Sequence, residues 1–560
     1  MSSIYQKFKE AALKNHAQNA VYWKSGKYWH SQSYKKFLST VDSLADGLLK
    51  MGVQRADKIA ILSENRPEWL ASDLAINKLG AVSVPIHTTS NQPLIEYILK
   101  DSKSGFLFVS NPLLSRNSDF FSQFVKEQPN LKIVSFDHGS NSQISADNLF
   151  FYEDLIKISG KNFESVESEL ASIVYTSGTT GEPKGVMLSN QNFLNNVDGA
   201  LKKFTITNQD KFLSILPLSH VLERTLGSYI AVIAGSSIAY AESIQQLSKN
   251  LKEIKPTIII GVPRIFEKTK QKIFLNIRNK NFLIKKLFFL SLKKNDTTLI
   301  KRVADKLIYK KIRQQFGGHL RFAVSGGAAI HERILRFYNS VDIKIVEGYG
   351  LTETSPIITC NTVENRAIGT VGDVLPGVEI KIGPDKEILT KSKSVMLGYW
   401  NKPELTKEII DGEGWFRTGD LGFIDGNKLL TIIGRKKDII VTSNGKNIFP
   451  EKIESAINLS PYINQSIVVG HKKNHLTALI IPDQESIKEN FKDQSVNIKS
   501  LIEKEVEKAN LLGHDYEKVE CFELLQEPFS VEKDELTPTL KIRRHVIESK
   551  YFNLIERMYK

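Results

Sequence analysis

The chain has 560 residues, which is too long for one ordinary hydrophobic core and predicts two or three domains. Its 41% hydrophobic and 25% charged residues are typical of a soluble globular protein, and its two cysteines, Cys360 and Cys521, exclude a disulfide framework and fit a reducing cytosol. The start has no apolar signal-peptide core, and no window approaches a membrane span of about 20 apolar residues. We therefore expect a cytoplasmic protein, with a peripheral position at the inner face of the cell membrane as the alternative.

The formal net charge of +14 has three explanations. Anionic small molecules or an anionic membrane surface suit it. Nucleic acid suits it by charge alone, but the sequence has no zinc-ligand spacing, RNA-binding signature or basic recognition helix, so we expect no nucleic-acid partner. A lysine-rich composition without any partner explains part of the charge.

The N-terminal part alternates predicted strands and helices. Apolar runs predict strands at 58–62, 81–86, 106–109 and 133–136, with helical patterns such as 93–99 between them. This alternation predicts βαβ units and hence a layered α/β domain with largely parallel strands.

A glycine- and hydroxyl-rich stretch follows the next predicted strand, 171–175. Its glycines let the backbone approach an anion, its N–H and hydroxyl groups can surround phosphate oxygens, and its lysine adds a mobile charge. The spacing is not that of the common P-loop. A flexible surface turn is the alternative, but the stretch is longer than a turn requires. The predicted phosphate-binding residues are Thr176, Ser177, Gly178, Thr179, Thr180, Gly181 and Lys184.

Further along, strands that end in turns are predicted at 211–216, 257–263 and 321–327. From about 360 to 434, short strands with frequent glycine turns predict a β-rich subdomain, and a small α/β unit runs from there to the end.

Residues 267–315 carry many cations and few acids, and Leu283, Leu287 and Leu290 repeat there at helical spacing. A basic amphipathic helix of this kind can lie on an anionic membrane. The alternative, which we prefer on sequence alone, is a helical hairpin that packs on the domain and leaves a solvated basic face.

The run from Tyr175 to Gly185, Tyr-Thr-Ser-Gly-Thr-Thr-Gly-Glu-Pro-Lys-Gly, resembles the phosphate-binding signature of the adenylate-forming (AMP-binding) superfamily. This group includes acyl-CoA synthetases, firefly luciferase and the adenylation domains of peptide synthetases. The resemblance extends over about residues 20 to 550 and is strongest to long-chain fatty acyl-CoA synthetases, the long-chain-fatty-acid–CoA ligases. It implies a large N-terminal AMP-binding domain of layered α/β subdomains plus a β-rich subdomain, and a small mobile α+β C-terminal domain. The implied domains are 1–434 and 439–560, joined by a hinge at 435–438.

Residues 347–354, Glu-Gly-Tyr-Gly-Leu-Thr-Glu-Thr, match the superfamily's Tyr-Gly-x-Thr-Glu motif. A hydroxyl and a carboxylate are the hard oxygen ligands that Mg²⁺ prefers, although a Thr-Glu pair alone is as easily a helix N-cap. The resemblance implies that Tyr349 stacks near adenine, that Thr352 touches phosphate and that Glu353 serves the Mg²⁺ that arrives with ATP. It also assigns to ATP or AMP binding Gly326, Gly327, Ala328, Glu347, Gly348 and Gly350.

Residues 414–422, Gly-Trp-Phe-Arg-Thr-Gly-Asp-Leu-Gly, resemble the family's Trp-x-x-Thr-Gly-Asp motif. An aspartate on a glycine-flanked turn can accept hydrogen bonds from both ribose hydroxyls, and Asp420 holds that position. Arg435 matches the arginine that also holds the ribose. Taken singly, a buried turn aspartate and a surface run of cations would explain these residues as well.

Two further motifs favour the long-chain synthetases. Residues 216–224, Leu-Pro-Leu-Ser-His-Val-Leu-Glu-Arg, resemble their Leu-Pro-x-x-His-x-x-Glu-Arg, which implies that His220 lies between the nucleotide and acyl pockets. A lone histidine would otherwise be structural. Residues 536–541 resemble Leu-Thr-Pro-Thr-x-Lys, whose lysine, here Lys541, reaches into the active site during adenylation. A positioned ammonium stabilises the charge that builds on the α-phosphate.

The implied reaction has two steps. A fatty acid and ATP with Mg²⁺ form acyl-AMP and pyrophosphate, and CoA then takes the acyl group and AMP leaves. Lys437 holds the hinge position. The thiolation face is implied at Ser443, Asn444, Gly445, Lys446 and Asn447. Acyl carrier protein is an alternative acceptor, and a nucleotide-binding lipid sensor without turnover is an alternative of another class.

Overall fold

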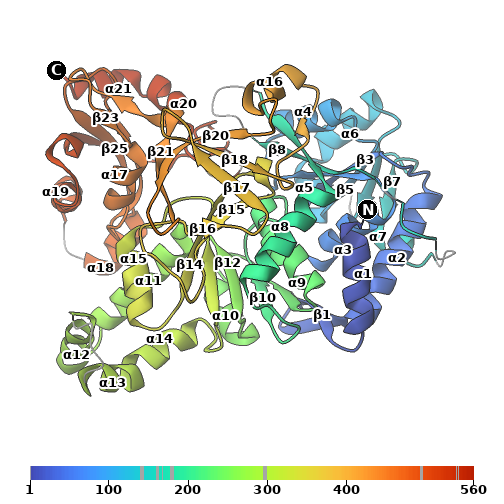
Figure 1. The fold of residues 1–560 in the computed structure, drawn as a ribbon, viewed down its shortest axis with the longest axis horizontal. Coiled ribbons are helices and arrows are strands. Elements are labelled where there is room, and N and C mark those ends of the chain that lie inside the picture. Colours follow the sequence, from blue (N-terminus) through green and yellow to red (C-terminus); the bar gives the residue numbers. More distant parts are fainter. Residues whose placement is uncertain are drawn as a thin grey trace.

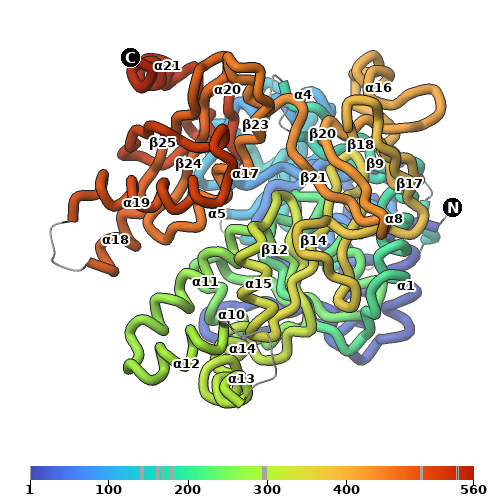
Figure 2. The backbone as a smooth tube through the Cα atoms, turned by 60° about the vertical axis from the view of Figure 1, so that its left-hand side comes forward, coloured from blue at the N-terminus to red at the C-terminus, as the bar shows by residue number. Residues whose placement is uncertain are grey.

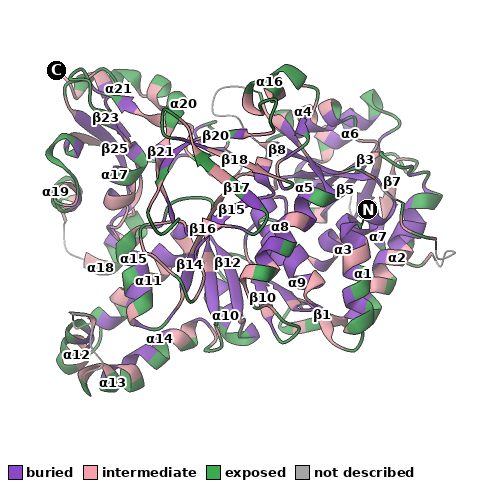
Figure 3. Ribbon diagram, viewed as in Figure 1, coloured by how far each residue is buried: buried purple, intermediate pink, exposed green. Residues whose placement is uncertain are grey.

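The body of the molecule consists of two large sheets with helices packed on them, beside a smaller antiparallel sheet and a C-terminal unit (Figure 1). This computed structural model describes residues 2–138, 144–158, 163–166, 168–176, 182–293, 299–491, 496–537, 539 and 541–560. In both large sheets the central strands, such as β3, β4, β10 and β12, are largely buried, and the outer faces of the covering helices are exposed (Figure 3).

The first sheet has eight strands in the order β19-β9-β8-β4-β3-β5-β6-β7. Strands β3 to β8 run parallel, and β9 and β19 lie antiparallel at one edge. The four strands predicted between 58 and 136 are confirmed to within one residue. The strands are β3 (Lys58–Leu62), β4 (Val82–Ile86), β5 (Phe106–Val109), β6 (Lys132–Ser135), β7 (Leu149–Phe151), β8 (Leu170–Thr176), β9 (Lys184–Ser189) and β19 (Gly398–Tyr399).

The second sheet has nine strands in the order β16-β15-β14-β13-β12-β10-β11-β1-β2. Neighbours β10 and β12 are parallel, and the chain leaves β10 towards β11 but leaves β12 towards β13. In open α/β sheets ligands bind at the carboxyl ends of strands where the connections diverge in this way. The strands are β1 (Asn19–Ser25), β2 (Tyr28–Ser33), β10 (Lys211–Ser214), β11 (Ser237–Tyr240), β12 (Ile258–Gly261), β13 (Phe322–Ser325), β14 (Ile345–Gly350), β15 (Ile357–Cys360) and β16 (Asp373–Val374).

Helices cover these sheets, and none of them, within the part of the chain that the structure describes, is long and apolar enough to cross a membrane. Two segments, η1 and η2, are π-helices. The elements are α1 (Ile4–Lys14), α2 (Tyr34–Lys50), α3 (Pro67–Lys78), α4 (Gln92–Ser102), α5 (Asn111–Arg116), α6 (Ser118–Glu127), α7 (Tyr152–Leu155), α8 (Asn190–Lys203), η1 (Glu223–Tyr229), α9 (Ile230–Ile233), α10 (Leu247–Ile254), α11 (Pro263–Arg278), α12 (Phe282–Lys293), α13 (Leu299–Ala304), η2 (Asp305–Tyr309), α14 (Lys310–Gln315) and α15 (Glu332–Ser340).

The four-stranded sheet is antiparallel, in the order β17-β18-β20-β21. The C-terminal unit buries two hydrophobic clusters of its own, formed by side chains between Ile440 and Ile555. The remaining elements are β17 (Val378–Ile382), β18 (Glu387–Ser392), α16 (Pro403–Ile409), β20 (Phe416–Ile424), β21 (Leu430–Arg435), β22 (Ile440–Val441), β23 (Asn447–Ile448), α17 (Pro450–Ile457), β24 (Ile463–Val469), β25 (Leu476–Pro482), α18 (Gln484–Phe491), α19 (Ile498–Asn510), β26 (Val519–Leu524), α20 (Arg544–Lys550) and α21 (Phe552–Arg557).

Polar contacts hold the C-terminal unit against α11, where the two lie side by side (Figure 2). Arg264 donates from its guanidinium to the side-chain oxygen of Asn464 at 3.1 Å, and Lys268 forms an ion pair with Asp483. In the segment just before this unit, Lys436 pairs with Asp385. These contacts define the orientation in which the C-terminal unit meets the large sheets.

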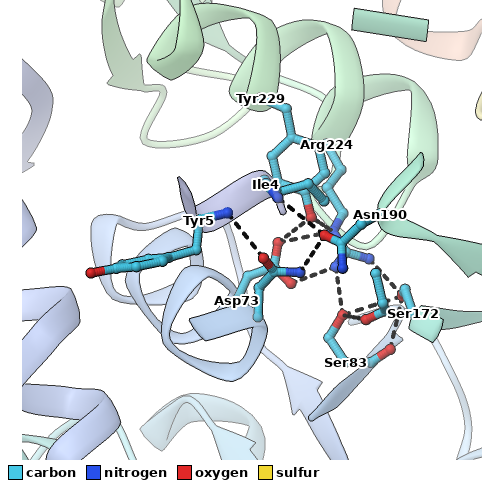
Figure 4. A network of polar contacts seen from close by, with 10 residues as sticks. Ile4, Tyr5, Asp73, Ser83, Ser172, Asn190, Arg224 and Tyr229 are labelled. Carbon is cyan, nitrogen blue, oxygen red and sulfur yellow. Dashed lines mark hydrogen bonds and ion pairs between the residues drawn. The ribbon is translucent and has the colours of Figure 1, made fainter. Parts of the chain in front are cut away.

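A buried ion pair joins the two large sheets (Figure 4). Arg224 on η1 pairs with Asp73 on α3, and both side chains are almost completely buried. The guanidinium also donates to the hydroxyls of Ser172 on β8, at 2.8 Å, and of Ser83 on β4. Tyr229 donates its hydroxyl to Asp73 at 2.6 Å. Because three elements of the first sheet layer hold one arginine of the second, η1 is fixed in position.

Breaking this pair on one side leaves a charge buried without its partner. We expect Asp73→Asn, which keeps the shape of the side chain, to lower the free energy of unfolding by about 3–5 kcal/mol. Urea denaturation measures this, with Glu332→Gln as control, because Glu332 forms an exposed pair with Arg336 that contributes little. Equal, small losses for the two variants would contradict a structural role for the buried pair.

Candidate active site

A cavity of about 900 Å³, part of it open to solvent, starts at the carboxyl ends of β13 and β14 and continues along one face of the second sheet. Phe322, Val324 and Gly326 all line it, and alternate residues of a strand face the same side. From Phe322 to Gly326 the chain advances by four residues, which is about 13 Å in a strand. The cavity therefore extends along the strand as a channel. Its apolar wall consists of Ala200, Phe204, Ile206, Phe212, Val221, Leu222, Leu226, Ile230, Ile258, Ile260, Phe322, Val324, Leu351, Pro356, Ile357 and Cys360.

Polar groups and glycines surround the mouth of this channel. The lining residues there are His220, Gly326, Gly327, Gly348, Tyr349, Gly350, Thr352 and Lys541. A Cβ atom on Gly350 would lie 1.6 Å from the carbonyl oxygen of Pro356, so no other residue fits this backbone. At Gly326 a Cβ atom would lie 3.2 Å from the Leu222 side chain. Glycine is therefore required by close approach at the first position and favoured at the second.

The predicted ribose residues are neighbours across two strands. Asp420 on β20 pairs in register with Arg435 on β21, and the arginine Nε lies 2.8 Å from a carboxylate oxygen of Asp420. Tyr349 donates its hydroxyl to the other oxygen of Asp420 at 2.8 Å. The motif predicted Asp420 on a turn, whereas Asp420 lies within strand β20, directly after Gly419, whose φ is +71°. The three side chains that the motifs suggested separately thus form one connected group.

Thr352 and Glu353 begin a short 3₁₀ turn directly after β14. Glu353 accepts a hydrogen bond from the hydroxyl of Tyr399 at 2.9 Å, and the ammonium of Lys184 lies 5.3 Å from the ring of that tyrosine. Desolvation and the nearby Lys437 lower the pKa of Lys184. Tyr399 is a residue that sequence reasoning missed, because nothing in the local pattern links it to Glu353.

The first and last of the predicted phosphate-binding residues lie on the neighbouring antiparallel strands β8 and β9. Thr176 ends β8 opposite Lys184, the first residue of β9. The predicted phosphate-binding residues Ser177, Gly178, Thr179, Thr180 and Gly181 lie outside the described residues.

A Mg²⁺ ion that arrives with ATP needs one or two carboxylates, because phosphates and water supply its other ligands. Glu353, with the Thr352 hydroxyl beside it, fits this requirement. Among the described residues no group of three or more His, Cys, Asp or Glu side chains is arranged to hold a metal ion by itself.

His220 stands at the mouth of the channel and is held as a neutral ring. Burial, the nearby His87 and Lys541 lower its pKa to about 3. The Leu222 N–H donates to its Nδ1 at 3.3 Å, which assigns the ring proton to Nε2. His87 in turn contacts the hydroxyl of Ser219 at 2.7 Å.

Asn65, which follows β3, fixes the backbone that leads to His220. Its side chain donates to the carbonyl of Leu216 at 2.6 Å and accepts from the N–H of Leu218 at 2.9 Å. Sequence reasoning missed both Asn65 and His87. The available signal for Asn65 was its position just past the end of a predicted buried parallel strand, where polar residues often belong to a binding site.

Lys541 reaches the channel mouth from the C-terminal unit. Thr537 holds its turn, since the Lys541 N–H donates to the Thr537 hydroxyl at 3.0 Å and the Thr537 N–H donates to the Lys541 carbonyl at 2.8 Å. Desolvation and the charge of Arg435 lower the pKa of the Lys541 ammonium. The structure therefore brings together a lysine and a motif tyrosine that lie almost 200 residues apart.

Other predicted residues do not reach the channel. Of the described residues, Ala328 is exposed and Glu347 and Glu353 lie near the mouth without lining it. Burial and the nearby Glu332 raise the pKa of Glu347 to about 8. The five residues 443–447 form an exposed turn between β22 and β23, and the Ser443 N–H donates to the Lys473 carbonyl, within the C-terminal unit, at 2.9 Å. Lys437 lies in a single 3₁₀ turn after β21.

Two family models match this chain. Residues 8–400 match the AMP-binding enzyme family, and residues 437–560 match the AMP-binding enzyme C-terminal domain. The chain belongs to the AMP-binding enzyme family. The predicted superfamily and fold class are confirmed.

Curated relatives cover nearly the whole chain. It is 33% identical to the long-chain-fatty-acid–CoA ligase FadD15 of Mycobacterium bovis over 95% of this chain and 92% of that protein. It is 29% identical to fatty acyl-CoA synthetase A of Dictyostelium discoideum (94% and 85% covered). It is also 29% identical to AEE15 of Arabidopsis thaliana, a chloroplastic long-chain-fatty-acid–[acyl-carrier-protein] ligase (94% and 82% covered).

Solved structures share the fold. The adenylation domain of a carboxylate reductase from Mycobacterium chelonae has a TM-score of 0.83 at 20% identity and covers 100% of this chain and 91% of its own. The anthranilate CoA ligase AuaEII, in complex with anthranoyl-AMP, has a TM-score of 0.78 at 20% identity, with 99% and 98% covered.

Glu223, three residues after His220, is a buried acid. Burial raises the pKa of its carboxyl from 4.5 to about 8, and the nearby Ser214 and Leu216 offset this only in part. Between these two values the folded state holds one proton more than the unfolded state, so stability falls as the pH rises from about 4.5 to about 8.

We expect Glu223→Gln to remove this dependence. From about pH 5 to about pH 8, the wild-type protein should lose roughly 2–4 kcal/mol more unfolding free energy than the variant. Urea denaturation of both proteins at each pH measures the difference, and the other titrating groups cancel because they are common to both. Parallel stability profiles would show that Glu223 ionises as it does in water.

Proposed function

We propose that the protein activates a long-chain fatty acid with ATP to give acyl-AMP and pyrophosphate, and then transfers the acyl group to CoA, releasing AMP. The observation that carries this is the apolar channel, whose mouth meets Tyr349, His220 and Lys541. An apolar channel that ends at a polar mouth suits a substrate with a hydrocarbon tail and a carboxylate head. The 33% identity to a long-chain-fatty-acid–CoA ligase supports the same substrate class.

We propose that the nucleotide lies across the carboxyl ends of β13 and β14. The adenine would lie by Tyr349 and Gly326–Gly327, and the ribose hydroxyls would meet Asp420 and Arg435. The connected contacts of Tyr349, Asp420 and Arg435 support this arrangement. The stretch 176–184 would close on the β- and γ-phosphates.

In the first step, Lys541 would stabilise the charge that develops when the carboxylate attacks the α-phosphate. The neutral His220 would donate from Nε2 at the boundary between the acyl channel and the nucleotide. Thr352 and Glu353 would hold Mg²⁺, which neutralises phosphate charge when bound. None of these residues needs to form a covalent bond, so catalysis rests on positioning and electrostatics.

In the second step, we propose that the C-terminal unit turns about Lys437, withdraws Lys541 and brings the exposed turn 443–447 to the channel mouth. The separate hydrophobic clusters of this unit support such a motion, because a rigid-body turn leaves them intact. CoA is the proposed acceptor. The likeness to a long-chain-fatty-acid–[acyl-carrier-protein] ligase makes acyl carrier protein the second candidate, and thioester formation measured with CoA and with holo-carrier protein separates the two.

A lipid sensor without turnover would be expected to have lost Lys541, Thr352 or Glu353, and all three are present. We propose a cytoplasmic location, which two free thiols at Cys360 and Cys521 support. Contact with a membrane is a separate proposal, argued below from the surface of α12 and α13.

Removing the lysine ammonium should affect one step alone. We expect Lys541→Ala to slow pyrophosphate release about 10²–10³-fold, because the Lys541 ammonium stabilises the charge that develops at the α-phosphate. Thioester formation from supplied acyl-AMP should be unchanged. Lys533→Ala is the control, since Lys533 lies in the same unit but pairs with Glu527 on the surface. Equal losses in both steps would refute this role for Lys541.

Phe204 and Phe322 both line the channel, and their rings stack with centroids 5.4 Å apart; Phe322 is the first residue of β13, at the opposite end of this strand from the mouth. We expect Phe204→Ala to deepen the channel and to raise the kcat/KM ratio of a longer over a shorter fatty acid about tenfold, the value of one or more methylenes in an apolar pocket. Pyrophosphate release across a fatty-acid series measures this, with the exposed Phe552→Ala as control. An unchanged ratio in a folded variant would mean that the acyl chain does not reach these rings.

A further inference from the structure

The connection between β12 and β13 contains two helical segments that we name the helical tip, residues 278–292 and 299–311. Figures 1 and 2 both show α12 and α13 at the outer edge of the molecule. Of the 18 large apolar side chains that are exposed among the described residues, seven lie in this tip. They are Phe282, Leu283, Phe289, Leu290, Leu299, Val303 and Leu307.

The α13–η2 segment carries two rows of side chains at a spacing of four residues. Leu299, Val303 and Leu307 form an exposed apolar row, between 41% and 76% exposed. Beside it run three exposed cations, Arg302, Lys306 and Lys310. Residues four apart lie on the same face of a helix, so an apolar row and a basic row face the solvent together.

Helix α12 has its own core contacts on the opposite face, so its exposed apolar residues are not needed for packing. Phe288 is completely buried and packs against Phe274, with ring centroids 5.5 Å apart. Phe282 and Leu283, on the outer side, are each 73% exposed. A packed hairpin with a solvated basic face was the preferred prediction, and the structure adds that the outer face is apolar as well as basic.

The charge of this region is strongly unbalanced. The sequence from 278 to 311 contains 11 Lys and Arg against two acids, Asp296 and Asp305. Asp305 is already paired with Arg313 at 2.8 Å. Lys306 and Lys310, for example, form no ion pair with any described carboxylate.

We propose that the helical tip docks on an anionic phospholipid membrane. Such a surface matches both rows, because lipid phosphates pair with the cations while the acyl boundary takes up the apolar side chains. A second copy that presented the same surface would bring cations against cations. Nucleic acid would match the basic row but would leave seven apolar side chains in water.

Flotation of the full chain with vesicles tests this without ATP, CoA or fatty acid, so its outcome is independent of the ligase activity. Vesicles of phosphatidylcholine alone are compared with vesicles in which one lipid in four is phosphatidylglycerol. We expect binding to the anionic vesicles only, weakened by high salt. The variant Arg302→Gln/Lys306→Gln/Lys310→Gln and the variant Val303→Ser/Leu307→Ser should each bind at least about tenfold more weakly.

The matched control is Lys35→Gln/Lys36→Gln/Lys50→Gln, which removes the same charge from exposed positions of α2. It should bind as the wild type does, and thermal unfolding of all variants checks that they are folded. Equal binding of the control and the tip variants would overturn the proposal, as would binding to neutral vesicles or no binding at all. Binding to a DNA duplex that the Arg302 variant loses while vesicle binding is absent would favour nucleic acid instead.

Discussion

The ion pair between Arg224 and Asp73 is the constraint on which the site depends. It fixes η1, which carries Leu226, and the segment that leads into η1 carries His220 and Leu222. All three residues line the channel. Asn65 holds the other end of this segment. A buried guanidinium needs all its donors satisfied, and here hydroxyls from β4, β8 and η1 complete the set, so the position of one arginine specifies how the two sheets meet.

The site is shared among three parts of the chain. The second sheet supplies Tyr349 and one face of the channel, the four-stranded antiparallel sheet supplies Asp420 and Arg435, and the C-terminal unit supplies Lys541. The lysine is the contribution that a rotation of the C-terminal unit would withdraw, since it belongs to a unit with its own hydrophobic clusters. Under the proposed rotation, such a division would let one channel serve two successive steps with different groups at its mouth.

Most strands and the motif residues could be predicted from the sequence, because each depends only on residues that are close together in the chain. Strands such as β3 and β5 are short apolar runs, and motifs such as Tyr349 to Glu353 keep their residues within one turn. The family could be predicted because several such motifs occur in the family's order along the chain. The contacts of Asn65 and Tyr399 could not be predicted. Each joins residues that are distant in the sequence and that come together only when the strands pack.

The channel itself also needed the structure. Its depth depends on strand register, which sets Phe322 beside Ile258 and so decides which side chains share a face. On α12 the sequence placed Leu283, Leu287 and Leu290 in one group, yet Leu283 and Leu290 are exposed while Leu287 packs inward. Helical spacing shows that a face exists but not which face is covered.

The most direct test of the central claim is a single-turnover reaction with a long-chain fatty acid and ATP, without CoA. The two-step account predicts that acyl-AMP and pyrophosphate form in equal amounts and that added CoA then converts the adenylate to thioester and AMP. Formation of ADP and phosphate, or a strict need for CoA before any pyrophosphate appears, would contradict it.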